Sequence, residues 1–263
     1  MTTSDAPILS IRGLSKQFGG VAAVSGIDLD VMPGETVAII GPNGAGKTTL
    51  YNLISGRMTP SAGTLVFEGR SVAGLAPYRI SRAGISRSFQ INNIFAELGV
   101  RENVEVAVSA HLGRSRRWWN IASRPGPVRA RADVLLERLS ISHLADHRAG
   151  TISYGDKRLL EITMVLATEP RLVLLDEPTA GMTPDETQRV TALIRRLADS
   201  GDFTFLITEH DMDVVFGLAD RILVMHRGQR LVLGTPDEVR RHPEVRTAYL
   251  GESDETSQPI EAS

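Results

Sequence analysis

A glycine-rich run at residues 41–48 has the residue types and spacing needed to bind phosphate. It matches the pattern G-x-x-x-x-G-K-S/T in full, with Gly41, Pro42, Asn43, Gly44, Ala45, Gly46, Lys47 and Thr48. Glycines allow backbone N–H groups to turn inward and approach a phosphate chain closely. Lys47 would reach the β- and γ-phosphates of a nucleotide, and the Thr48 hydroxyl would ligate magnesium. The β-branched run before this segment and the helical pattern after it supply the context that such a loop requires.

Two adjacent carboxylates follow a second apolar run. Residues 172–175 predict a buried strand, and Asp176 and Glu177 stand at its end. Because ligands of open α/β sheets bind at the carboxyl ends of strands, we expect Asp176 beside the glycine-rich loop. There Asp176 would hold magnesium, and Glu177 could orient and deprotonate an attacking water. The structural alternative is a polar turn, since Pro178 stops regular structure, but the glycine-rich loop makes that interpretation the weaker one.

Together the two segments predict a site that binds ATP and Mg²⁺ and hydrolyses the nucleotide. A guanine-specific protein would carry an Asn-Lys-x-Asp stretch, and the sequence has no Asn-Lys dipeptide. Glu177 directly after Asp176 favours hydrolysis over transfer to an acceptor other than water.

The elements that must position these residues change in character along the chain. Short strands are expected at residues 8–12, 27–31, 36–40 and 64–68, and their crowding before the first long helix suggests an antiparallel sheet beside the main one. The pattern is helical between about residues 100 and 139, with an interruption. After residue 151 strands and helices alternate, which predicts a parallel α/β sheet. One of these helices is predicted to begin at Pro184, with Thr183 as its N-cap and Glu186 completing a capping box.

Composition limits the function classes. The chain has 263 residues, of which 42% are hydrophobic and 23% are charged, as in ordinary globular proteins. A net charge of −2 gives no general attraction to nucleic acid or anionic membranes. The absence of Cys excludes disulfides, thiolate catalysis and Cys-ligated zinc. No run approaches the roughly 18 apolar residues of a membrane span, and the start does not match a secretory signal. We therefore expect the chain either to stay in the cytosol or to reach a membrane only through a partner.

At this point the chain resembles, over nearly its whole length, the nucleotide-binding subunits of ABC transporters. Ile152-Ser153-Tyr154-Gly155-Asp156 stands where that family carries its Leu-Ser-Gly-Gly-Gln signature. Ser153 can cap a helix while its hydroxyl and the Gly155 N–H face an anion. In the family this segment completes the ATP pocket of the opposite subunit. The resemblance therefore implies a head-to-tail dimer, homomeric or heteromeric, that encloses ATP between its subunits.

The resemblance also implies roles for five further residues. Gln90 looks like the glutamine that contacts magnesium or the attacking water and couples to the membrane partner, and His210 looks like the histidine that contacts the γ-phosphate. Phe18 looks like the aromatic that stacks on adenine, with Val24 beside it, and Thr49 belongs to the phosphate cradle. Each of the first three has a plainer interpretation: Gln90 as a solvated loop residue, His210 as a polar residue at a strand–helix junction, and Phe18 as core.

Three positions depart from the family pattern. Tyr154 replaces the first signature glycine, and Asp156 replaces the glutamine. Asp156 would bring a carboxylate near a γ-phosphate, or it would serve as the third position of a capping box with Ser153. Thr183 stands where the family has Asp or Asn, and its capping role explains it without a contact across a dimer.

Several segments resemble one branch of the family, the LivG-type ATPases of branched-chain amino acid importers. These segments are Phe18-Gly19-Gly20, Ser88-Phe89-Gln90, Ser153-Tyr154-Gly155, Gly234-Thr235-Pro236 and Tyr249-Leu250-Gly251-Glu252. The partners implied are a second ATP-binding subunit, transmembrane permease subunits and, indirectly, a periplasmic substrate-binding protein, with the chain at the cytoplasmic face of the membrane.

The expected fold is an α/β P-loop NTPase with a RecA-like parallel core, an antiparallel β-subdomain and a helical subdomain inserted at about residues 92–162. The nucleotide-binding domain would span residues 8–251, between a flexible N-terminus at 1–7 and a flexible tail at 252–263.

Alternatives concern the whole chain and one insert. A remodeller of DNA or ribosomes would carry two cassettes or long coiled coils, which this sequence lacks, and Glu177 and His210 argue against a module that binds ATP without hydrolysis. Residues 111–131 combine six Arg with Trp118 and Trp119. This insert fits a solvated loop, a docking surface for a membrane partner or, least well, a nucleic-acid contact. No nucleic-acid partner is expected.

Overall fold

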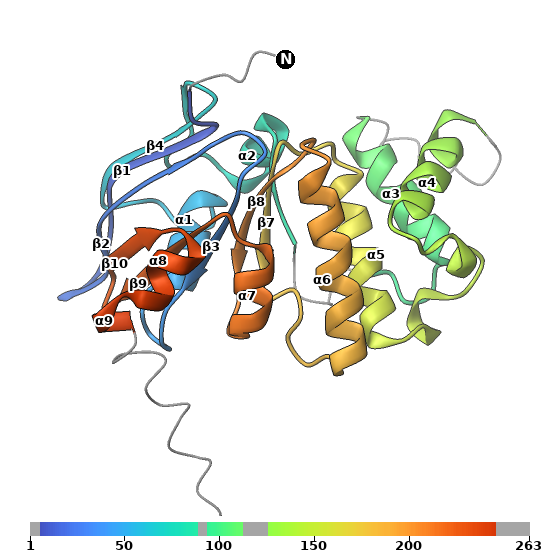
Figure 1. Cartoon of the computed structure of the whole chain (residues 1–263). Coiled ribbons are helices and arrows are strands. Elements are labelled where there is room, and N and C mark those ends of the chain that lie inside the picture. Colours follow the sequence, from blue (N-terminus) through green and yellow to red (C-terminus); the bar gives the residue numbers. More distant parts are fainter. Residues whose placement is uncertain (1–5, 89–93, 113–125, 246–263) are drawn as a thin grey trace, which may run out of the picture.

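The computed structural model describes residues 6–88, 94–112 and 126–245. Gln90, Trp118, Trp119 and both chain ends lie outside these ranges, so the expectations for them stay predictions. Within the described ranges the chain forms two sheets and a set of helices (Figure 1).

The larger sheet is mainly parallel. Its strands follow the order β10-β9-β3-β8-β7-β6, and only β10 runs antiparallel to its neighbour. The bounds are β3 Thr36–Ile40, β6 Ile85–Arg87, β7 Leu172–Asp176, β8 Thr204–Thr208, β9 Arg221–His226 and β10 Gln229–Gly234. Every residue of β3 and β8 is buried. Continuous burial of this kind is typical of parallel strands that are covered on both faces.

The smaller sheet is antiparallel, with the order β2-β1-β4-β5. It comprises β1 Leu9–Phe18, β2 Val21–Val31, β4 Ala62–Phe67 and β5 Arg70–Ser71. The first two strands are longer than the sequence suggests and continue to a hairpin at Gly19 and Gly20. Irregular register between them disrupts the alternation of apolar residues. That irregularity is why only the regular outer halves of the strands were recognisable.

The helices lie around the two sheets. They are α1 Lys47–Ile54, α2 Pro77–Ala83, α3 Val100–His111, α4 Pro127–Arg138, α5 Tyr154–Leu166, α6 Pro184–Asp199, α7 Met212–Leu218, α8 Pro236–Arg241 and α9 Pro243–Val245, with 3₁₀ turns at Ser142–Leu144 and Ala149–Thr151. The antiparallel sheet and the pair α3–α4 lie at opposite ends of the molecule, with the parallel sheet between them (Figure 1). Helix α6 begins with the expected capping box between Thr183 and Glu186.

Strand β7 belongs to two cores. Val173 and Leu175 pack in the cluster that includes α3–α6, whereas Leu172 and Leu174 pack in the cluster that includes α1 and the antiparallel sheet. All four side chains are fully buried. Packing on both faces fixes the strand, and therefore fixes where the carboxylates after Leu175 emerge. The architecture is the P-loop α/β core with an antiparallel sheet and a helical part that the sequence predicts.

Candidate functional site

The glycine-rich loop joins β3 to α1 in a conformation that needs glycine. Gly41, Gly44 and Gly46 have φ values of 152°, 80° and 100°, a region that side chains with a Cβ disfavour. A Cβ on Gly41 would lie 2.2 Å from the Met225 carbonyl oxygen, and one on Gly46 would lie 2.4 Å from the Ala23 carbonyl oxygen. The loop therefore passes directly against the backbones of β9 and β2, which holds it in a fixed shape.

Lys47 begins α1 and is almost fully buried, with 8% of its surface exposed. Its Nζ donates hydrogen bonds to the carbonyl oxygens of Gly41, at 2.5 Å, and Pro42, at 3.2 Å. Burial lowers the pKa of Lys47, while the charges of Glu177 and Asp176 act in the opposite direction. The ammonium and the positive end of the helix dipole thus lie close to two carboxylates, as a phosphate-binding site requires.

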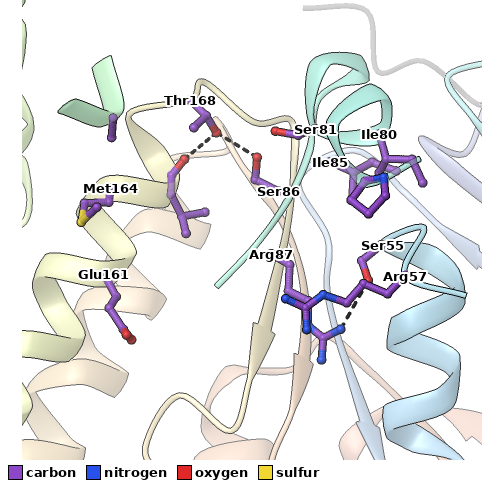
Figure 2. A pocket seen from close by; sticks show the side chains of 13 residues that line it. Ser55, Arg57, Ile80, Ser81, Ile85, Ser86, Arg87, Glu161, Met164 and Thr168 are labelled. Atoms are coloured by element: carbon purple, nitrogen blue, oxygen red, sulfur yellow. Dashed lines mark hydrogen bonds between the residues drawn. The ribbon is translucent and has the colours of Figure 1, made fainter. Parts of the chain in front are cut away.

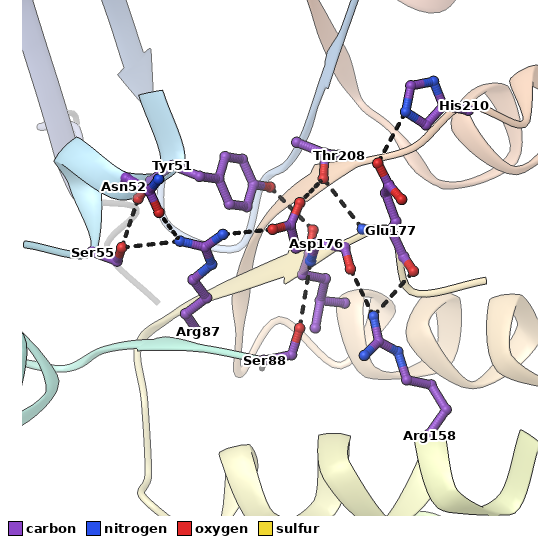
Figure 3. Close-up of polar contacts among 11 residues, drawn as sticks. Tyr51, Asn52, Ser55, Arg87, Ser88, Arg158, Asp176, Glu177, Thr208 and His210 are labelled. Carbon is purple, nitrogen blue, oxygen red and sulfur yellow. Dashed lines mark hydrogen bonds and ion pairs between the residues drawn. The ribbon is translucent and has the colours of Figure 1, made fainter. Parts of the chain in front are cut away.

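Asp176 ends β7, and both of its carboxylate oxygens are held by neighbouring side chains. Oδ2 accepts a hydrogen bond from Arg87 at 2.5 Å, and Oδ1 accepts one from the Thr208 hydroxyl at 2.6 Å (Figure 3). Thr208 is the residue that pairs with Asp176 across the parallel ladder. The carboxylate is therefore oriented from β6 on one side and from β8 on the other.

Glu177 leaves the strand in a left-handed conformation, with φ 46°. This region is costly for a residue with a side chain. The Glu177 N–H is held by the Thr208 carbonyl oxygen at 3.0 Å, and its Oε1 lies 3.0 Å from Nε2 of His210 (Figure 3). Both side chains are nearly half exposed, so the Glu177 carboxylate and its histidine partner are accessible to solvent.

The structure brings the loop and the acid pair together. Strands β3 and β7 flank β8 in the sheet, so their carboxyl ends lie one strand apart. Tyr51 of α1 is buried and its hydroxyl donates to the Leu175 carbonyl oxygen at 3.2 Å. Burial raises the pKa of Tyr51, and this hydroxyl therefore stays a donor. The glycine-rich loop, an ammonium and two carboxylates consequently form one candidate site.

Thr48 and Asp176 suit a magnesium ion that arrives with a nucleotide. Magnesium prefers oxygen ligands and commonly binds through one or two protein groups together with phosphates and water. Among the described residues, no group of three or more His, Cys, Asp or Glu side chains could hold a metal by itself. A hydroxyl and one carboxylate beside a phosphate cradle fit a magnesium ion that is bound jointly by the protein, phosphates and water.

The segment around Ser153 begins α5 and is bonded within the chain. Ser153 is the N-cap, and its hydroxyl donates to Asp156 Oδ2 at 2.8 Å and accepts from the Asp156 N–H. The Gly155 N–H donates to Glu186 Oε1 at 3.0 Å, and Asp156 pairs with Arg189 at 2.8 Å. The two groups expected to face an anion thus contact the chain's own carboxylates.

The two candidates for adenine binding differ in exposure. Phe18 ends β1 with 47% of its surface exposed, and the Lys16 ammonium lies 5.3 Å from its ring centre. Val24 is fully buried within the core under the antiparallel sheet. Phe18 therefore offers a face on which a base could stack, whereas Val24 shapes the strand beneath it. Thr49 lies half-buried in the first turn of α1.

Sequence reasoning missed the polar residues that hold the acid pair. Thr208 stands at the end of an apolar run, but nothing in the sequence shows that this strand lies beside β7. Arg87 stands at the end of a three-residue strand that is too short to recognise. Arg158 of α5 is buried and donates to the backbone carbonyl oxygens of Asp176, at 2.7 Å, and Pro178, at 3.1 Å.

Comparisons with known proteins show which family the chain belongs to. The family model described as ABC transporter matches residues 24–180, and the model described as branched-chain amino acid ATP-binding cassette transporter matches residues 229–255. The high-affinity branched-chain amino acid transport ATP-binding protein LivG of Escherichia coli (strain K12) is 40% identical over 94% of this chain and 99% of its own length. The corresponding protein BraF of Pseudomonas aeruginosa is 39% identical over the same shares of each chain.

Solved structures show the same fold. An ATP-binding cassette of an ABC transporter in an ADP conformation superposes with a TM-score of 0.82 and 31% identity, and the match covers 93% of this chain and 99% of that one. A nucleotide-free ATP-binding cassette gives a TM-score of 0.81 at 31% identity, over 92% and 98% of the two chains.

Proposed function

The chain belongs to the family of ATP-binding subunits of ABC transporters, and from this premise we propose that it is the ATPase of an importer of branched-chain amino acids. The proposal of the cargo is supported by the similarity to LivG and BraF and by the second family match at residues 229–255. As an ABC transporter ATPase, the chain binds ATP.

Each part of the site has a task in hydrolysis. The loop amides and Lys47 bind the phosphates and stabilise the charge that develops on them. Glu177 accepts a proton from the attacking water, and His210 holds its carboxylate in position. Magnesium, bound by Thr48 and Asp176 together with the phosphates, would neutralise charge on the nucleotide. The observation that carries this assignment is the adjacency of the glycine-rich loop to the two carboxylates.

Replacing Glu177 tests the assignment. Glu177→Gln should bind ATP with the affinity of the unaltered chain but release no phosphate, because the amide cannot accept the proton. The matched control is Glu97→Gln, which alters a carboxylate that is 87% exposed and contacts Arg148 rather than the site. The experiment measures phosphate release beside equilibrium binding of ATP. Normal turnover by Glu177→Gln would show that another group is the base.

A cavity beside the site suits the docking of a membrane-spanning partner. It has a volume of about 220 Å³ and lies between β6 and α2 on one side and α3 and α5 on the other (Figure 2). Its walls are mainly apolar and include Ile80, Ile85 and Met164, with Arg57 and Arg87 toward one end. We propose that a transmembrane permease subunit occupies this cavity, and that α3–α5 move as a helical subdomain.

Filling the cavity tests the docking proposal. Ala107 lines the cavity from α3, and Ala107→Trp should abolish copurification with the cognate permease while the isolated chain still hydrolyses ATP. Val134→Trp is the matched control, because Val134 is 63% exposed on α4. Copurification of Ala107→Trp at the normal yield would exclude this cavity as the docking place.

The same family membership supports a dimer at the cytoplasmic face of the membrane. No helix in the described ranges is long and apolar enough to cross a bilayer, so attachment would depend on the permease. We propose that Ser153 and Gly155 face the ATP of a second ATP-binding subunit when the dimer closes. Their present contacts with Asp156 and Glu186 would then be exchanged for contacts with phosphate. A periplasmic substrate-binding protein would supply the cargo.

A further inference from the structure

Arg87 links the phosphate-binding helix to the metal carboxylate. One arm of its guanidinium donates to Asp176 Oδ2 at 2.5 Å. The other arm donates to Asn52 Oδ1 on α1 at 2.7 Å and to the hydroxyl of Ser55, the C-cap residue of α1, at 3.3 Å. The guanidinium also lies 5.5 Å from the centre of the Tyr51 ring (Figure 3). Its side chain is 8% exposed, so the guanidinium is held in place on several sides.

The fixed positive charge of the Arg87 guanidinium disfavours the binding of a second cation beside Asp176. Arginine does not lose its proton in proteins, so its charge is present at every physiological pH. Partial burial strengthens charge interactions relative to water. Arg57 lies near the same cavity, where burial lowers its pKa and the charge of Arg87 lowers it further. The side of Asp176 that faces β6 is therefore positively charged even before a metal ion arrives.

We propose that Arg87 is the counter-ion of Asp176 and that it sets the magnesium affinity of the nucleotide site by competing with Mg²⁺ for this carboxylate. The inference rests on the proposed function, because it takes Mg²⁺ and ATP as the ligands. Arg87 is a positioning residue that acts through Asp176. Removing its charge strengthens Mg²⁺ binding, whereas loss of a merely structural residue would leave that binding unchanged or weaken it.

A magnesium titration tests the competition. Binding of a fluorescent ATP analogue is followed as Mg²⁺ is added at constant ionic strength, with the unaltered chain, Arg87→Gln and Arg87→Lys. For Arg87→Gln the half-saturating Mg²⁺ concentration should fall about tenfold, which is the effect expected for removal of one nearby charge. Arg87→Lys keeps the charge and should stay near the unaltered value. Arg101→Gln is the matched control, because it removes a similarly shielded arginine that pairs with Asp133 on α4.

An unchanged or higher Mg²⁺ requirement in folded Arg87→Gln would overturn the inference. A measurement of nucleotide binding in EDTA, which removes Mg²⁺, distinguishes failure of the inference about Arg87 from failure of the proposed function. If the unaltered chain binds no nucleotide at all, both ideas fall, whereas normal binding without the shift removes only the role of Arg87. Nuclear magnetic resonance of the Arg87 Nε–H in the unaltered chain gives a second measurement that needs no folded variant. Adding Mg²⁺ to the ATP-bound protein should shift this resonance, and an unmoved signal would contradict the competition.

Discussion

We expect the Thr208 hydroxyl to increase the rate of ATP hydrolysis by a measurable amount, and the variant Thr208→Val tests this. The substitution keeps the shape of the side chain and removes the donor that holds Asp176 Oδ1 at 2.6 Å. The Glu177 N–H keeps its bond to the Thr208 carbonyl oxygen at 3.0 Å, so the backbone stays satisfied. The Thr208 hydroxyl also accepts a second hydrogen bond from the Glu177 N–H at 3.2 Å, so the substitution weakens the support of Glu177 as well as the orientation of Asp176.

The size of the effect follows from the charge and the exposure of the acceptor. A hydrogen bond to a charged group contributes about 1.5–3 kcal/mol. The Asp176 side chain is 27% exposed, so water replaces part of the lost bond, and we expect a cost of about 1 kcal/mol. That cost lowers the melting temperature by about 2–4 °C in a chain of this size. If the same energy orients the carboxylate during the reaction, kcat falls about fivefold.

The assay compares phosphate release and thermal unfolding in three variants. Thr204→Val is the matched control, because Thr204 lies on the same strand and its hydroxyl accepts a hydrogen bond from the Gly34 N–H at 3.0 Å, at the end away from the site. Thr208→Ser restores the hydroxyl and should restore the rate. If Thr208→Val hydrolyses ATP normally while it unfolds at a lower temperature, the bond contributes to stability alone and the reasoning fails.

Two further predictions concern the loop and the α6 cap. Gly46→Ala should abolish ATP binding, because its Cβ would lie 2.4 Å from the Ala23 carbonyl oxygen at a φ of 100°. Gly201→Ala is the control for backbone strain, since Gly201 has a φ of 71° and a Cβ there would have no neighbour within 4 Å. Equal ATP binding by the two variants would contradict the steric argument. Hydrogen bonds from the Thr183 and Gly155 backbones lower the pKa of Glu186, so its contribution to stability is present above its unfolded pKa and is lost as the pH falls through the folded value. Urea unfolding of Glu186→Gln should therefore depend less on pH below about 4.3 than unfolding of the unaltered chain, and parallel pH profiles would contradict this.

The fold could be predicted from the sequence wherever the residue pattern of a segment matches the burial of that segment in the folded chain. The run at residues 172–175 is apolar throughout, and β7 is buried on both faces. Thr183 and Glu186 make the capping box that their spacing predicts. The hairpin of β1 and β2 was only partly accessible, because register irregularities break the period of two that identifies a strand.

The polar network behind the carboxylates was not accessible, because its partners lie far apart in the sequence. Asp176 receives its two side-chain donors from β6 and β8, and the parallel ladder alone decides that these strands are its neighbours. A motif gives the types of the reacting groups, since their spacing within one loop or strand end is local. It does not give the residues that orient them, since each is a single polar side chain whose position in its own segment is unremarkable. Asp176 is therefore recognisable as a candidate metal ligand from residues 172–177 alone, whereas the charge that Arg87 places beside it becomes evident only when the sheet is assembled.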